Sequence, residues 1–138
     1  MKITFLVTSV LCSAILLSCS KGQSALTTKD KLLGKWKVDS ISSKEFRNGI
    51  PGNSPTEIGK PGEYAQFNND GKYYLYINGF SQTGTYSIIN DTSMAMYQAS
   101  DTFNLRLREL TKTKLYLYSK KQVSGDSIYL EDKYFFYK

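Results

Sequence analysis

Apolar and polar residues alternate with a period of two through most of this chain, and tight-turn signals interrupt the alternation at short intervals. Successive side chains of a β-strand point to opposite faces, so this pattern indicates strands with one buried face and one face in water. Residues 102–110 illustrate it, with apolar side chains at 103, 105 and 107 and polar or charged ones between them. The sequence therefore predicts an all-β fold.

Eight short strands are expected, separated by turns and one long loop. Residues 68–71 and 78–79 are typical of tight hairpin turns, because each ends in a glycine, which tolerates the positive φ that such turns require. The expected strands cover residues 35–42, 64–67, 73–77, 83–89, 94–98, 102–110, 115–118 and 127–137. This arrangement predicts an eight-stranded, up-and-down antiparallel barrel or a strongly curved sheet.

Two further segments accompany these strands. Residues 28–33 predict one short helix, with Thr28 as its N-cap and Gly34 placed to end it. Residues 44–62 contain all three prolines and four glycines, and we expect them to form a loop. A loop of this length in a small domain is often a lid or a binding loop.

The residues that most enzymes and metal sites need are absent. Without histidine the chain lacks the commonest general base and the commonest metal ligand. The two cysteines, Cys12 and Cys19, both lie near the N-terminus, and the rest of the chain has none for a disulfide or a zinc site. We therefore expect no catalytic site, no metal and no cofactor.

The first eighteen residues have the character of an export signal. Lys2 precedes an uncharged, mostly apolar stretch over residues 3–17. As a helix this stretch would span about 22 Å, short of the ~30 Å hydrocarbon core that a permanent membrane span must cross. Lys2 is its one charged residue, so removal of the segment lowers the formal charge from +6 to +5. The remaining positive charge is modest, and we expect no nucleic acid as a partner because this segment predicts export of the protein.

The end of the segment resembles the lipobox of bacterial lipoproteins. Residues 16–19 read Leu-Leu-Ser-Cys, with a branched apolar residue three before the cysteine and a small residue just before it, although Leu17 stands where the pattern has a small residue. The resemblance implies that Cys19 carries lipid and becomes the N-terminus, with residues 19–28 as a polar tether at a membrane. We expect a cell-envelope location, at the outer membrane and facing the periplasm. The alternative is ordinary secretion, with Cys19 as a free thiol.

Residues 29–138 resemble the lipocalin-like domain of small lipoproteins from Gram-negative bacteria. Gly34-Lys35-Trp36, which opens the first strand after a short helix, is similar to the Gly-x-Trp signature of lipocalins. Further matching motifs are residues 67–73, 84–86, 110–115 and 134–136. The closing strand departs from the pattern, since Lys133 and Lys138 stand in for the arginine that stacks on this tryptophan. The resemblance implies a barrel fold and export, and no particular ligand.

A barrel of eight strands has an interior that is either filled by side chains or able to hold one small apolar ligand. Both alternatives stay open from the sequence. The alternation directs the same ten side chains inward in either case, and we predict them as the lining of a ligand site: Trp36, Val38, Tyr73, Leu75, Ile77, Phe103, Leu105, Leu107, Leu115 and Leu117.

Four tyrosines on the opposite face suggest a second hypothesis. Tyr74, Tyr76, Tyr116 and Tyr118 are expected to project outward together. Exposed tyrosines are favoured at protein and sugar interfaces, so they would suit a non-enzymatic module that binds an envelope protein or a glycan. The alternative is that they form ordinary cross-strand pairs that stabilise the sheet.

Overall fold

The computed structural model describes residues 26–124 and 127–138. The predicted signal segment, the lipid site at Cys19 and most of the predicted tether lie outside these residues. One helix and ten strands follow each other along the described chain: α1 (Thr28–Leu32), β1 (Gly34–Arg47), β2 (Ile50–Pro51), β3 (Thr56–Ile58), β4 (Tyr64–Phe67), β5 (Lys72–Ile77), β6 (Phe80–Asn90), β7 (Ser93–Gln98), β8 (Asp101–Leu110), β9 (Lys114–Ser124) and β10 (Ile128–Tyr137).

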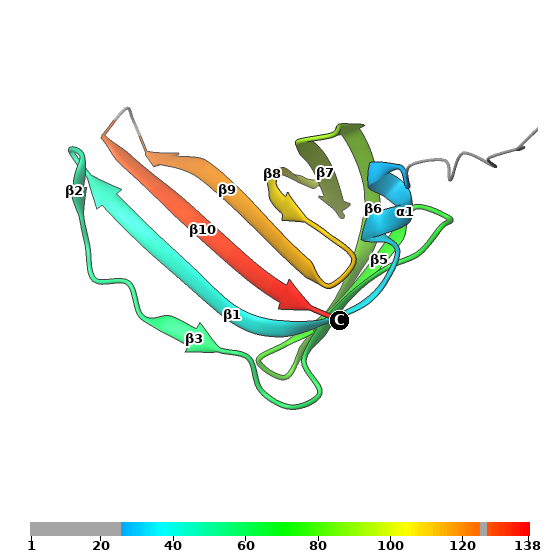
Figure 1. Ribbon diagram of the computed structural model, residues 1–138. Coiled ribbons are helices and arrows are strands. Elements are labelled where there is room, and N and C mark those ends of the chain that lie inside the picture. Colours follow the sequence, from blue (N-terminus) through cyan, green and yellow to red (C-terminus); the bar gives the residue numbers. More distant parts are fainter. Residues whose placement is uncertain (1–25, 125–126) are drawn as a thin grey trace, which may run out of the picture.

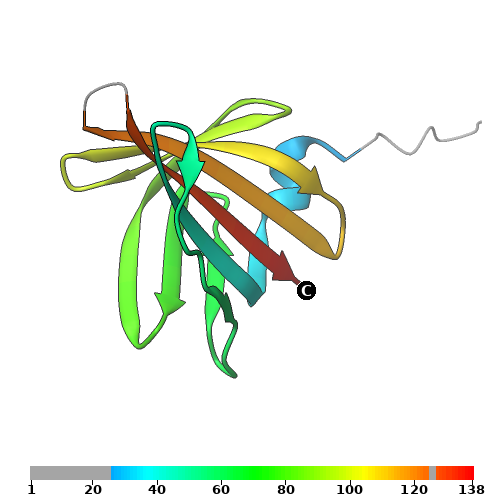
Figure 2. The same cartoon turned by 90° about the vertical axis from the view of Figure 1, so that its left-hand side faces the viewer.

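Eight of the ten strands form a closed antiparallel ring (Figures 1 and 2). Around the ring the order is β1, β4, β5, β6, β7, β8, β9 and β10, and β10 pairs again with β1. The last contact excludes an open curved sheet, in which the first and last strands would be free edges. The predicted all-β, up-and-down barrel with one short helix is confirmed.

The N-cap of the helix differs from the prediction by one residue. Thr27, not Thr28, caps α1, because its side chain accepts a hydrogen bond from the backbone N–H of Asp30 and the Asp30 carboxylate accepts one from the backbone N–H of Thr27. This reciprocal pair is a capping box, which satisfies two of the backbone donors that the first turn of a helix leaves free. Thr27 is the N-cap instead of Thr28 because Asp30 lies three residues after it and exchanges both hydrogen bonds with it.

The long loop expected over residues 44–62 is partly strand. β1 continues to Arg47 because β10 supplies an antiparallel partner along its whole outer half, ending at the pair Arg47 and Ile128. The chain then returns along the free edge of β1 as β2 and β3. The Ser54 hydroxyl, between these two strands, donates to the Ser43 carbonyl at 2.8 Å. Backbone pairing thus orders a segment whose prolines and glycines favour a loop.

Trp36 closes the end of the barrel beside α1. Its side chain is fully buried, and its indole N–H donates to the backbone carbonyl of Leu32 in the helix at 2.7 Å. The ammonium of Lys138 lies 4.0 Å from the centre of the tryptophan ring and donates to the Leu33 carbonyl at 2.7 Å. Lys138 thus occupies the place of the expected arginine, as a cation on an aromatic face.

The barrel wall has a gap between β8 and β9, because these two strands pair over only part of their length. The two strands pair from Arg106 with Tyr118 to Leu110 with Leu115, at the turn that joins them. Among the described residues, Asp101 to Leu105 pair with β7 alone, and the outer half of β9 pairs with β10 alone. In Figure 1, β1, β10 and β9 accordingly run as one long layer that leans away from β6 and β7. The interior opens on this side, opposite the end closed by Trp36.

Replacement of Trp36 by Phe tests the closed end. The smaller ring leaves a void and removes the donor to Leu32, so we expect the free energy of unfolding to fall by about 2–3 kcal/mol. Urea unfolding measures this change. Tyr137→Phe, at an exposed side chain nearby, is the control and should change stability by less than about 0.5 kcal/mol. Equal stability of W36F and the unmodified protein would contradict this role of Trp36.

Candidate functional site

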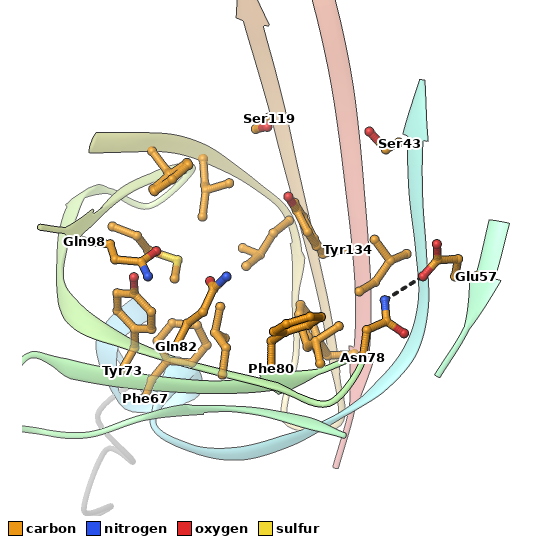
Figure 3. Close-up of a pocket in the computed structure, with 18 of the residues that line it drawn as sticks. Ser43, Glu57, Phe67, Tyr73, Asn78, Phe80, Gln82, Gln98, Ser119 and Tyr134 are labelled. Carbon is orange, nitrogen blue, oxygen red and sulfur yellow. Dashed lines mark hydrogen bonds between the residues drawn. The ribbon is translucent and has the colours of Figure 1, made fainter. Parts of the chain in front are cut away.

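A cavity of about 520 Å³ occupies the open part of the barrel. Its volume lies in the range of ligand pockets, roughly 300–1,000 Å³. The walls come from all eight strands of the ring and from β3, and Figure 3 shows the lining side chains converging from them. The apolar part of the lining consists of Ile41, Pro55, Phe67, Tyr73, Leu75, Ile77, Phe80, Met96, Phe103, Leu105, Leu117, Tyr134 and Phe136.

The ten predicted interior residues divide into two groups. Six line the cavity, namely Tyr73, Leu75, Ile77, Phe103, Leu105 and Leu117. The other four do not line it and are buried in the packed core: Trp36, Val38, Leu107 and Leu115. The sequence left a filled barrel and a hollow one as alternatives, and the structure contains both, one at each end. That any of the ten contacts a ligand stays a prediction.

Some lining residues were missed because the backbone departs from simple alternation. A bulge between Val38 and Ser40 shifts the phase of β1, so Ile41 faces inward although it is an odd number of residues from Val38. Phe80 was expected beside a turn, and it lines the cavity from the first position of β6 with 73% of its surface exposed. Phe67 and Phe136 do follow the alternation, in step with the buried Ala65 and the partly buried Tyr134, and could have been found from it.

Two walls of the cavity carry polar groups of different kinds. On β1 and β9, the hydroxyls of Ser43 and Ser119 both donate to the carboxylate of Asp132, at 2.6 and 3.2 Å. Burial, followed by the nearby Asp132 charge, raises the pKa of the Tyr134 phenol on this side to about 12, so the phenol is protonated at neutral pH. On the opposite wall, Gln82 and Gln98 reach inward from β6 and β7 (Figure 3).

Tyr73 packs into a space that Gly84 leaves open on β6. The two residues are cross-strand partners. A Cβ built on Gly84 would lie 2.9 Å from the Tyr73 hydroxyl and 2.1 Å from the backbone carbonyl oxygen of Tyr97. Glycine is therefore required here for the tyrosine ring to lie flat on the strand. Burial raises the pKa of Tyr73, which keeps its hydroxyl protonated as a hydrogen-bond donor.

Polar contacts fasten the β3 segment to the turn between β5 and β6. The Asn78 side chain donates to Glu57 at 2.8 Å, and the ammonium of Lys60 donates to the Asn78 side-chain oxygen at 3.3 Å. Buried Glu63 accepts hydrogen bonds from the backbone N–H groups of Asn78 and Lys60, at 2.7 and 2.9 Å. These contacts hold one rim of the cavity in place.

The four outward tyrosines do not form one surface. Tyr74 and Tyr76 lie on β5 and Tyr116 and Tyr118 on β9, and these strands are diametrically opposite in the ring. The expectation that they project together is therefore wrong, because alternation tells inside from outside but not the position of a strand around a barrel. Tyr76 contacts Tyr64 and Tyr116 stacks on Phe135, so two of the four make the ordinary cross-strand contacts of a sheet.

Residues 26–124 and 127–138 contain neither a metal-binding cluster nor a membrane-spanning helix. No group of three or more cysteine or carboxylate side chains gathers in a way that could hold a metal ion there. Over the same residues, the model contains no helix with the length and hydropathy needed to cross a membrane.

Comparison with known proteins yields one structural likeness. No protein-family model and no curated protein matches the sequence. Among solved structures, a deswapped triple mutant of bovine odorant binding protein is similar in part, with 15% sequence identity and a TM-score of 0.49. The likeness covers 78% of this chain and 74% of the other. The strand pairings and lining residues of this chain establish the barrel and its cavity without this likeness.

Glu63 should make the stability of the rim depend on pH. The backbone N–H groups of Lys60 and Asn78 hold the pKa of its carboxyl below its usual value of 4.5. Its contribution to folding is therefore complete above about pH 4.5 and is lost as the pH falls through the lower folded-state pKa. We expect Glu63→Gln to lower the urea midpoint at neutral pH and to flatten its dependence on pH between about 5 and 3.

Glu57→Gln is the matched control. The Glu57 carboxylate is exposed and accepts from the Asn78 side chain, not from a backbone donor, so its removal should leave the pH dependence in place. An unchanged pH profile in E63Q would show that the two backbone contacts contribute nothing to folding.

Proposed function

We propose that this protein is a non-enzymatic binding protein that holds a small apolar molecule inside its barrel. The observation that carries the proposal is the cavity at one end of the barrel, whose other end is closed by Trp36. Thirteen of its nineteen lining residues are apolar or aromatic. Burial of apolar surface is worth about 25 cal/mol per Å², so a hydrocarbon transferred from water to such walls gains free energy without a specific partner.

Two exposed aromatic residues at the cavity mouth support entry of a ligand from the open end of the barrel. Phe103 is 39% exposed on β8, beside the gap between β8 and β9, and it lines the cavity. Phe80 lies at the rim beside the turn between β5 and β6. Because these two aromatic side chains are exposed and also line the cavity, they supply an apolar path inward.

Obstruction of the cavity tests this function. Diphenylhexatriene, a pure hydrocarbon that fluoresces in apolar surroundings, is the probe. We expect this probe to bind the unmodified protein. Ile77→Trp should weaken binding about tenfold or more, because Ile77 lines the cavity and the larger indole side chain would fill part of it. Fluorescence titration gives both dissociation constants, and unfolding curves show that I77W is folded.

Ile89→Trp is the matched control for this experiment. Ile89 lies on β6, does not line the cavity and is mostly exposed, so the same substitution there should leave probe binding unchanged. Equal binding by I77W and the unmodified protein would place the probe outside the barrel and contradict the proposal.

We further propose that the protein is exported and held at the cell envelope by lipid on Cys19, at the outer membrane and facing the periplasm. The support is the lipobox-like Leu16-Leu17-Ser18-Cys19 after an apolar, uncharged segment. Each buried CH₂ of an acyl chain contributes about 0.8 kcal/mol, so two or more chains suffice for stable anchoring. The residues that follow would hold the barrel off the bilayer.

Cys19→Ala tests the anchor. In a Gram-negative host, we expect the unmodified protein to fractionate with membranes and to incorporate labelled palmitate, and C19A to lose both properties. Cys12→Ala is the matched control, because Cys12 belongs to the proposed signal and should be dispensable for lipid attachment. C19A that stays membrane-bound and labelled would refute lipidation at this residue. Unlabelled, soluble wild-type protein would favour ordinary secretion.

A further inference from the structure

We propose that the cavity contains a polar subsite, formed by Tyr73, Gln82 and Gln98, that selects ligands with an uncharged oxygen group. Such a ligand has an apolar body and a hydroxyl, carbonyl or carboxamide end. This inference rests on the proposed binding function and adds a class of ligand to it.

The three side chains lie on one wall of the cavity. Tyr73 pairs with Gly84 across β5 and β6, and Gln82 pairs with Leu75 one inward-facing position further along the same two strands. Gln98 follows Tyr97, whose register partner Thr85 is adjacent to Gly84. Figure 3 shows the polar ends of Gln98, Tyr73 and Gln82 directed toward the middle of the cavity. Three neighbouring strands therefore supply one cluster.

The hydrogen-bonding groups of this cluster are free in the described structure. The Tyr73 backbone carbonyl accepts from the Thr83 hydroxyl. Within residues 26–124 and 127–138, no hydrogen bond joins the Tyr73 hydroxyl or either glutamine side chain to another residue. Tyr73 is only 1% exposed, yet every fully buried polar side-chain atom in the described chain has a partner. The tyrosine hydroxyl must therefore open onto the cavity. A phenol and two amides together offer both donors and acceptors to whatever fills it.

On the opposite wall, the two serine hydroxyls already have a partner. The Ser43 and Ser119 hydroxyls are already committed as donors to Asp132. Serine hydroxyls in such bonds have less capacity left for a ligand, and the nearby carboxylate repels an oxygen with negative charge. The Tyr134 phenol is a single group on that wall and lies close to the Asp132 charge. The wall with Tyr73, Gln82 and Gln98 offers three polar groups together, so a polar group of the ligand has more partners there.

The charges around the cavity favour an uncharged group. No lysine or arginine is among the lining residues, and Glu57 is the one charged side chain among them, already bonded to Asn78. A carboxylate or phosphate buried here would have no cation among the lining residues as partner, which is strongly unfavourable in a protein interior. A hydroxyl, carbonyl or carboxamide needs only the hydrogen bonds that the subsite offers.

Competition between matched ligands tests the subsite. Decanol and decanoate share their chain length and differ in the charge of the head, and each is used to displace diphenylhexatriene at neutral pH. We expect decanol to bind about tenfold more tightly than decanoate. The triple variant Tyr73→Phe, Gln82→Met, Gln98→Met keeps the side-chain sizes, and we expect it to bind decanol about tenfold more weakly, since the polar end then has no partner. Its affinity for the hydrocarbon probe should stay within about twofold.

Tyr74→Phe is the control, because Tyr74 is the neighbour of Tyr73 on β5 and points to the outside. It should change neither affinity. Unchanged decanol binding in the triple variant, or tighter binding of decanoate than of decanol, would overturn the subsite and leave the apolar binding function standing. Weaker decanol binding in Tyr134→Phe alone would place the polar end on the opposite wall and also overturn it. Absence of probe binding to the unmodified protein would overturn the subsite and the proposed function together.

Discussion

The pairing of β1 with β10 is the interaction on which the rest of this structure depends. It extends from Lys37 with Tyr137 to Arg47 with Ile128, and it joins the first and last strands of the ring. Without it, both strands would expose unpaired backbone groups and the inward aliphatic side chains would face water. Because the pairing continues past the point where β8 leaves β9, it also makes one layer of the barrel longer than the other. The β1–β10 pairing thus closes the ring of strands, while the barrel interior stays open at the end where β8 and β9 separate.

The two ends of the barrel have different roles. At the end beside α1, Trp36 bonds to the helix and Lys138 lies on its ring, so the interior there is packed and closed. Toward the other end the side chains no longer meet, and a cavity of about 520 Å³ remains. Packing supplies stability where it is complete, and its absence supplies a place for a ligand. The polar subsite lies between the two regions, since Tyr73 belongs to the buried core and also lines the cavity.

Local rules predicted much of this fold. Alternation located all eight strands of the ring, and the glycines at 71 and 79, both with positive φ, marked two of its turns correctly.

Contacts between distant segments decided what the sequence did not show. β1 extends into residues expected as a loop because β10 lies beside it, and the bulge near Asp39 reverses the phase that would have excluded Ile41. Alternation was also silent on the angular position of each strand, which is why two pairs of tyrosines were wrongly joined into one surface. Gln82 and Gln98 are polar and face inward, so hydrophobic pattern alone could not assign them.

The proposal that the interior of this barrel holds an apolar molecule has a direct test. Native mass spectrometry of the protein purified from its own host, without detergent exchange or denaturation, tests it most directly. We expect a second species, heavier by the mass of one small molecule that leaves as a neutral on collisional activation. Protein of its own mass alone, in a sample that also takes up no hydrocarbon when one is supplied, would show that the barrel holds no apolar molecule.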